Sequence, residues 1–244
     1  MDEMLKRTEM LIGADGVQKL KNSHVAVFGL GGVGGICAEA LARSGVGKLT
    51  IIDRGVVTPS NLNRQIIATE NTIGINKVDA MAERIRSISP TCEVTAIKTF
   101  FLMGDDGKVV FSEFDYIIDA MDVITAKLSI VELAKKANIP LVSVMGTGNR
   151  IDPTKVRVGE LFETRYCPLC KFMRKKLRRR GITSVTAVYS EEHPTEPLDI
   201  LFTDSGKSVP ASMMFVPSAA GLAAASFVVR SLIEDEPTPQ EDSN

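Results

Sequence analysis

Short apolar runs alternate along the first part of the chain with longer segments in which apolar residues recur every three or four positions. The runs at 24–28, 49–53 and 116–122 have the length and nearly continuous apolar character of strands buried on both faces of a sheet. The segment at 77–88 instead places its apolar residues on one face of a helix. This alternation predicts an α/β fold of the Rossmann type, with a doubly wound, mainly parallel sheet.

Beyond residue 150 the pattern predicts shorter elements before one long final helix. Two strands near Ile200 and Met213 would form a C-terminal β-extension just before that helix. The final helix, 216–233, is very apolar, but it contains Pro217 and Arg230 and is barely long enough to span a bilayer. We therefore expect it to be buried or to pack at a dimer interface, with no stable membrane association. The other expected elements are a strand at 156–159, a helix at 168–180, a strand at 185–189 and a loop at 190–197.

The chain of 244 residues is long enough for one large domain, which would bury roughly 70–75% of its unfolded surface. We expect a single domain over 1–233, with its ligand-binding part at about 20–150. The tail, 234–244, is acidic and rich in proline, which predicts disorder. No apolar leader opens the chain, and its four cysteines form no disulfide framework, so we expect a cytoplasmic protein.

A glycine-rich turn, Gly-Leu-Gly-Gly-Val-Gly at 29–34, joins the first predicted strand to a helix. Its glycines let the backbone approach a ligand closely, and the helix N-terminus offers free N–H groups to an anion. Asp53, which closes the next apolar run, could accept hydrogen bonds from ribose hydroxyls. The pattern therefore predicts a nucleotide site, but it does not choose between a dinucleotide and ATP. The glycines expected to touch the nucleotide are Gly29, Gly31, Gly32 and Gly34.

Two cations favour ATP over NAD or FAD at this site. A triphosphate carries about four negative charges and requires fixed cations, whereas a dinucleotide needs little here beyond ribose contacts. Arg64 and Lys77 could each be a plain surface charge. As a set, however, both are expected at the same edge of the sheet as Asp53, because they come after the strand that ends there. Asp122, at the end of the fourth apolar run, could hold Mg²⁺ against the phosphates. Asp119 could do the same, or cap the following helix.

Together these motifs resemble the superfamily of ubiquitin-activating and ThiF-type adenylating enzymes. The glycine turn, Asp53, the sequence SNLNRQ at 60–65, Lys77 and the sequence DAMD at 119–122 stand in the order that the superfamily shows. Three further segments resemble its tRNA threonylcarbamoyladenosine dehydratase branch. They are KRTEMLIG at 6–13, AEALARSG at 38–45 and NRIDPT at 149–154.

The resemblance implies that the enzyme uses ATP and Mg²⁺ to convert a carboxylate of threonylcarbamoyladenosine in tRNA into an acyl adenylate, which then cyclises with loss of water. It also implies that the glycine turn and Asp53 hold the adenosine, that Asp122 binds Mg²⁺, and that Arg7 reaches the nucleotide from the neighbouring subunit of a homodimer. A sulfur-transfer protein is a further partner to consider. The residues around the phosphates would be Asn61, Arg64, Gln65 and Lys77.

The cysteines bear on the alternative branch, in which the enzyme adenylates the C-terminal carboxylate of a sulfur-carrier protein. Those enzymes often close a zinc site with two CxxC pairs, but only Cys167 and Cys170 have that spacing here. The missing second pair argues against this branch without excluding it. For Cys167 and Cys170 we favour ordinary packing at a helix start over a zinc site or a redox or disulfide role. Cys37 and Cys92 are expected to be small buried hydrophobes.

A basic segment at 171–180 carries seven Lys or Arg residues, although the whole chain has a net charge of −1. Phe172, Met173 and Leu177 have the spacing that would hold such a helix on the body, with its bases outward. We expect this surface to contact the tRNA phosphate backbone. The alternatives are a solvated helix face and an intersubunit patch that faces the acidic tail. The expected contacts are Arg174, Lys175, Arg178 and Arg179.

Overall fold

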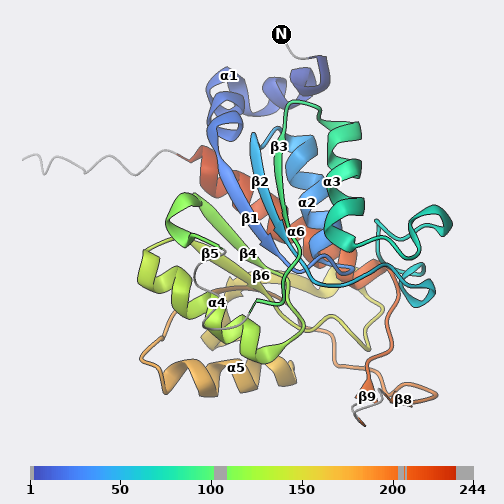
Figure 1. Cartoon of the computed structure of the whole chain (residues 1–244). Coiled ribbons are helices and arrows are strands. Elements are labelled where there is room, and N and C mark those ends of the chain that lie inside the picture. The colour runs from blue at the N-terminus through green and yellow to red at the C-terminus, as the bar shows by residue number, and fades with distance from the viewer. Residues whose placement is uncertain (1–2, 102–108, 203–205, 207, 235–244) are drawn as a thin grey trace, which may run out of the picture.

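The computed structural model describes residues 3–101, 109–202, 206 and 208–234 (Figure 1). Its centre is a seven-stranded sheet with the order β3-β2-β1-β4-β5-β7-β6. Neighbouring strands are parallel except at one edge, where β6 runs antiparallel to β7. The strands are β1 His24–Phe28, β2 Lys48–Ile52, β3 Glu93–Ile97, β4 Tyr116–Asp119, β5 Leu141–Val144, β6 Val156–Glu160 and β7 Thr186–Ser190.

Helices cover both faces of the sheet (Figure 1). α2, α3 and α6 share one apolar cluster with one face, while α4 and α5 pack on the other. α1 contacts α6 beside the start of β1. The expected α/β fold with a mainly parallel sheet and a final helix is therefore confirmed. The helices are α1 Lys6–Asn22, α2 Gly34–Ser44, α3 Lys77–Ile88, α4 Ile124–Ala137, α5 Pro168–Arg178 and α6 Phe215–Ile233.

The apolar run of β1 serves two cores at once. Val25 and Val27 belong to the cluster with α2 and α6, whereas Ala26 and Phe28 belong to the cluster on the opposite face. Successive side chains of a strand point to opposite faces, so a strand covered on both sides must be apolar at every position. The uninterrupted run in the sequence is thus a direct consequence of the two helical layers.

The direction of the sheet order reverses between β1 and β4, because β1 leads outward to β2 and β3 while β4 leads to β5 on the other side. The loops that follow β1 and β4 therefore separate at the carboxyl edge and leave a crevice, the usual ligand site of open α/β sheets. Phe28 and Asp119 are register partners, and the Ala120 N–H donates to Phe28 O over 2.8 Å. A glycine turn and an acidic loop thus begin side by side.

Several boundaries differ from the sequence-based expectations. β4 ends at Asp119, so Asp122 lies in the loop beyond the strand. The β-extension consists of β8, Leu201–Phe202, and β9, Ser208–Val209, and the strand expected near Met213 is wrong. Backbone carbonyls just before Met213 accept hydrogen bonds from the Asn149 N–H and the Asn63 side chain instead of from a strand. Residues 235–244 of the expected disordered tail lie outside the described residues.

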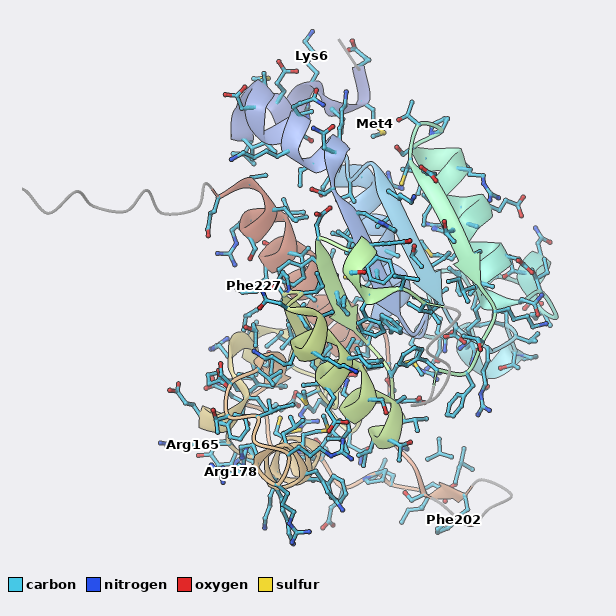
Figure 2. The ribbon with its side chains drawn as sticks, turned by 60° about the vertical axis from the view of Figure 1, so that its left-hand side comes forward. Met4, Lys6, Arg165, Arg178, Phe202 and Phe227 are labelled. Carbon is cyan, nitrogen blue, oxygen red and sulfur yellow. The ribbon has the colours of Figure 1, made fainter. Side chains whose placement is uncertain are left out.

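α6 is the single helix among the described residues that is long and apolar enough to cross a membrane. It packs along α2, α1 and β6. Figure 2 shows Phe227 of this helix, whose ring meets that of Tyr116 edge-on at 6.5 Å between centroids. These contacts agree with the expected buried helix.

Candidate active site

A cavity of about 430 Å³ opens at the carboxyl edge of the sheet, between the glycine turn and the loop after β4. The expected nucleotide residues come from the segments that follow β1, β2 and β4 and from the start of α3, and the fold gathers nearly all of them here. Those that line the cavity are Gly29, Gly31, Gly32, Asp53, Asn61, Arg64, Gln65, Lys77 and Asp122.

The glycine turn brings the N-terminus of α2 up to the cavity. Gly29 has a φ of 89°, and a Cβ there would lie 2.7 Å from the backbone oxygen of Ala120. A Cβ on Gly34 would lie 1.8 Å from Gly29 O, so Gly34 permits the helix to start directly behind the turn but does not itself line the cavity. No side chain caps α2, which leaves its first N–H groups for a ligand.

Asp53 ties this turn to the loop after β2. One carboxylate oxygen accepts the Leu30 N–H over 2.7 Å, and the other accepts the Gly55 N–H over 2.6 Å. Each oxygen retains a further lone pair. Asp53 therefore shapes the turn and can still accept a hydroxyl from a ligand in the cavity.

Arg64 and Lys77 supply positive charge that the protein itself does not neutralise. Within the described part of the chain, neither forms an ion pair with a carboxylate. Arg64 is held by hydrogen bonds from Nη1 to Ser60 O and to the Asn63 side chain, at 2.8 and 3.1 Å. Lys77 is the first residue of α3, and its N–H donates to Gly55 O over 3.0 Å. Two cations without a carboxylate partner favour a polyanionic ligand.

The structure separates the two carboxylates of the DAMD sequence. Asp119 is fully buried, pairs with Lys127 over 2.9 Å, and accepts the Ser143 hydroxyl and the Met121 N–H. Its oxygens are committed to the protein, so it is neither a cavity ligand nor a cap of α4. Asp122 is exposed and lines the cavity, which leaves it as the carboxylate available to a cation.

Asn61 and Gln65 are buried polar residues in the wall of the cavity. Asn61 accepts the Thr58 N–H over 3.2 Å, as part of a short capping turn. Gln65 Oε1 is buried without a hydrogen-bond partner. Because such an oxygen is costly to leave unsatisfied, its position in the wall fits a ligand that brings a donor or a hydrated cation. The donor set of the cavity therefore suits a nucleotide with Mg²⁺.

Sequence reasoning missed several lining residues. Arg54 directly follows Asp53, and its guanidinium lies 4.1 Å from the ring centroid of Phe100. The position of Arg54 at a strand end was the one signal that could have found it. Thr147, Ser212 and Pro217 come from later segments, and no local pattern marks them as cavity residues.

Arg7 does not reach the cavity of its own chain. It is exposed on α1, next to the amino-terminal end of β1 and at the opposite end of the sheet from the glycine turn (Figure 1). Figure 2 likewise shows Lys6 at one end of the molecule and Phe202 at the other. A role for Arg7 at a nucleotide requires a second copy of the chain.

The basic residues expected to meet nucleic acid lie on α5, and they are not equivalent. Lys175, Arg178 and Arg179 are exposed, and Figure 2 shows Arg178 at the rim of the molecule. Arg174 is half-buried, and its Nη1 donates to Thr164 O over 2.9 Å and to the Thr164 hydroxyl. Phe172, expected to hold the helix down, is 40% exposed. Its place is taken by Cys170, which packs with Met173 and Leu177.

The four cysteines are free and buried, as expected for Cys37 and Cys92. Burial raises the pKa of Cys37 to about 12 and that of Cys92 to about 11. Cys167 and Cys170 lie in the core beneath α5. Among the described residues, no group of three or more His, Cys, Asp or Glu side chains could hold a metal ion.

Known proteins resemble this chain over nearly its whole length. A tRNA threonylcarbamoyladenosine dehydratase of Bacillus subtilis (strain 168) is 40% identical over 245 residues, which cover 96% of each chain. Solved structures of the E. coli tRNA N6-threonylcarbamoyladenosine dehydratase in complex with ATP and with AMP superpose with TM-scores of 0.86 and 0.85. Both are 32% identical; the ATP complex covers 95% of this chain and 94% of its own, and the AMP complex 96% of each.

The model of the ThiF family matches residues 5–242, almost the entire sequence. The match includes the glycine turn, both cations of the cavity and the loop that carries Asp122. The chain belongs to the ThiF family.

Proposed function

We propose that this protein is an adenylating enzyme that uses ATP to dehydrate and cyclise threonylcarbamoyladenosine in tRNA. The observation that carries the proposal is the gathering of two unpaired cations, Arg64 and Lys77, and an accessible carboxylate, Asp122, around one glycine turn. The proposal draws its substrate from the relatives, whose names describe this reaction. We expect a cytoplasmic enzyme, because tRNA is its substrate.

Within the cavity, Asp53 would accept the ribose hydroxyls of ATP, and the free N–H groups at the start of α2 would meet its phosphates. Arg64 and Lys77 would stabilise the charge that grows on the departing pyrophosphate. Asp122 would hold Mg²⁺, which supplies further positive charge at the phosphates when bound. The buried Oε1 of Gln65 would gain a partner from the same ligand.

The chemistry requires no nucleophile from the protein. A carboxylate oxygen of the threonyl group attacks the α-phosphorus of ATP, and the bond to the bridging oxygen of pyrophosphate breaks. The resulting acyl adenylate has a good leaving group. The carbamoyl group of the same modified base then attacks the acyl carbon, closes the ring and expels AMP. One carboxylate oxygen leaves on AMP, so the net change in the base is loss of water.

The exposed bases of α5 would hold the tRNA through its phosphates. Lys175, Arg178 and Arg179 form a positive surface on a chain whose overall charge is slightly negative. Such contacts position a nucleic acid without reading its sequence. Arg174 would act from behind this surface, because its guanidinium is already bonded to Thr164.

A homodimer would complete the site. Arg7 is exposed on α1, and Met10 and Leu11 of the same helix are 82% and 84% exposed. Apolar side chains this exposed favour contact with another protein surface. Docking of α1 against a second copy would allow Arg7 to reach that copy's nucleotide.

The test of the reaction is nucleoside mass spectrometry on tRNA that carries threonylcarbamoyladenosine, after treatment with the protein and ATP. We expect the modified adenosine to lose the mass of one water, with release of AMP and pyrophosphate. The Asp122→Asn variant is the matched control and should leave the nucleoside unchanged. Adenylation of a sulfur-carrier protein, with no change in the tRNA, would instead support an adenylyltransferase.

The dimer is tested by mixing two inactive variants, Arg7→Ala and Asp122→Asn, under conditions that exchange subunits. If Arg7 acts across the interface, one site of each mixed dimer contains both native residues, and activity returns. A mixture that stays inactive, although mixed dimers form, would show that Arg7 does not act in the partner's site.

A further inference from the structure

Cys167 and Cys170 occupy the first turn of α5 in a geometry that goes beyond ordinary packing. Cys167 is the N-cap residue of the helix, Pro168 its first residue, and Cys170 lies one turn on. Both cysteines belong to one buried cluster, and a Cβ on Gly146 would lie 3.9 Å from the sulfur of Cys167. The thiol of Cys170 also acts directly on the sulfur of Cys167. The two sulfurs are therefore neighbours at the positive end of a helix dipole.

A buried arginine adds a charge to this arrangement. Arg150 is only 4% exposed, and its Nη1 donates to Gly146 O and Gly148 O over 2.9 and 3.1 Å. Its Nε donates to Glu192 O over 3.1 Å, while its Nη2 is buried without a partner. In the described part of the chain, no carboxylate pairs with it. Its positive charge acts on Cys167, so the guanidinium has a sulfur anion as its counterpart.

These contacts decide which cysteine carries the negative charge. The Cys170 thiol, the nearby backbone N–H groups and Arg150 outweigh the effect of burial and lower the pKa of Cys167 below that of an ordinary thiol. The pKa of Cys170 is raised instead, because it donates to that sulfur and is buried beside it. A thiolate next to a protonated thiol is the arrangement found in reactive CxxC pairs.

We propose that Cys167 and Cys170 form a redox-active dithiol that exchanges with low-molecular-weight disulfides. The Cys167 thiolate attacks one sulfur of the external disulfide, whose S–S bond breaks and releases one thiolate. Cys170 then attacks the Cys167 sulfur, and the second external thiolate leaves. The Cys170 proton passes to a departing thiolate. The protein loses two electrons and forms an intramolecular disulfide, while the external disulfide is reduced to one thiol and one thiolate.

The position of the pair links it to the cavity. Gly146 and Arg150 belong to the loop after β5, and Thr147 of that loop lines the nucleotide cavity. Oxidation removes the anion whose charge faces Arg150. Gly146, which lies beside Cys167, is thus the immediate neighbour of a residue in the wall of the proposed active site.

Access to Cys167, which is 3% exposed, passes through the segment just before α5. Tyr166 in this segment is exposed and has a φ of 62°, a conformation that costs energy in a residue with a side chain. We expect Cys167 to become accessible through local opening of this segment, which does not require the sheet to unfold.

The experiment uses the Cys37→Ser/Cys92→Ser protein, in which only the pair remains, with the wild-type chain in parallel. Each is incubated with oxidised glutathione, blocked with a maleimide and measured by intact mass. We expect both thiols of the pair to disappear without a stable adduct. With Cys170→Ser added, one glutathionyl group should accumulate on Cys167, and with Cys167→Ser added, neither product should form.

Two measurements keep the outcome decisive if the background substitutions disturb folding. Peptide mapping of the oxidised wild-type chain should find the link between Cys167 and Cys170. Alkylation of Cys167 by iodoacetamide should have a pH midpoint well below that of an ordinary thiol, because the pKa of Cys167 is lowered. Retention of both thiols in excess oxidised glutathione, or a stoichiometric zinc ion on the pair, would overturn the proposal.

Discussion

Lys127 Nζ lies 2.9 Å from Asp119 Oδ2, and neither side chain is exposed to solvent. Lys127 also donates to Val144 O over 2.7 Å, while Asp119 accepts the Ser143 hydroxyl. The pair therefore joins α4 to the ends of β4 and β5. Through the Met121 N–H, Asp119 also fixes the loop that carries Asp122.

Removal of one partner should be strongly destabilising. Lys127→Met leaves a buried carboxylate without its counter-ion, and we expect the free energy of unfolding to fall by about 3–5 kcal/mol. Lys48→Met is the control, because Lys48 pairs with Glu93 at the surface over 3.3 Å and should change stability by about 0–1 kcal/mol. Urea denaturation measures both. Similar values for the two variants would mean that the buried pair is not important for stability.

Arg64 and Lys77 in the cavity should matter for turnover and little for folding. We expect Arg64→Ala and Lys77→Ala each to lower ATP–pyrophosphate exchange by about 10²–10³-fold, because they would stabilise charge on the leaving pyrophosphate. Their stability should change by less than about 1 kcal/mol. Arg86→Ala, an exposed change on α3 outside the cavity, should leave exchange intact. Binding of NAD more tightly than ATP would contradict the assignment.

Substitution of Asp122 and of Asp53, the two carboxylates of the cavity, should affect different kinetic parameters. Asp122→Asn should abolish adenylate formation, because a metal ligand acts on charge that develops in the transition state. Asp53→Asn should mainly raise the KM for ATP. It should also cost about 1–3 kcal/mol of stability, since an amide nitrogen cannot accept the Leu30 or Gly55 N–H. Equal kinetic losses in the two variants would contradict the assignment of metal binding to Asp122 and ribose binding to Asp53.

Salt dependence of tRNA binding tests the surface of α5. Arg178→Ala and Arg179→Ala should each weaken binding similarly for any tRNA sequence and reduce the slope of log K against log salt by about one unit. Arg174→Ala should instead lower the melting temperature, because its guanidinium holds Thr164. An unchanged slope in both surface variants would mean that this helix face is solvated and does not contact the tRNA phosphates.

The nucleotide site could be predicted to the extent that its signals are local. The glycine turn and Asp53 adjoin apolar runs, so their place at strand ends follows from the sequence itself. The choice between Asp119 and Asp122 could not be made, because it depends on Lys127 reaching Asp119 from the next helix. Pro217 enters the cavity wall from a helix about 190 residues beyond the turn, and no local pattern reports such a contact.

Contacts between distant parts of the sequence also explain two incorrect predictions, those for Phe172 and for a strand near Met213. Phe172 has the spacing of a core residue, but α5 packs on the body through Cys170, Met173 and Leu177 and leaves Phe172 40% exposed. The strand expected near Met213 has suitable side chains. Its neighbours instead hydrogen-bond to Asn149 and Asn63, which belong to distant loops.

The close contact of α6 with the start of α2 bears on how the chain folds during synthesis. A Cβ on Gly221 would lie 2.4 Å from Val33 O, and Pro217 of the same helix completes the cavity wall. The glycine turn is synthesised well before the surface against which it packs, because that surface belongs to α6, which begins at Phe215. At about 5–20 residues per second, the nucleotide site would stay unfinished for roughly ten seconds or more. A nascent chain stalled before α6 should not bind ATP.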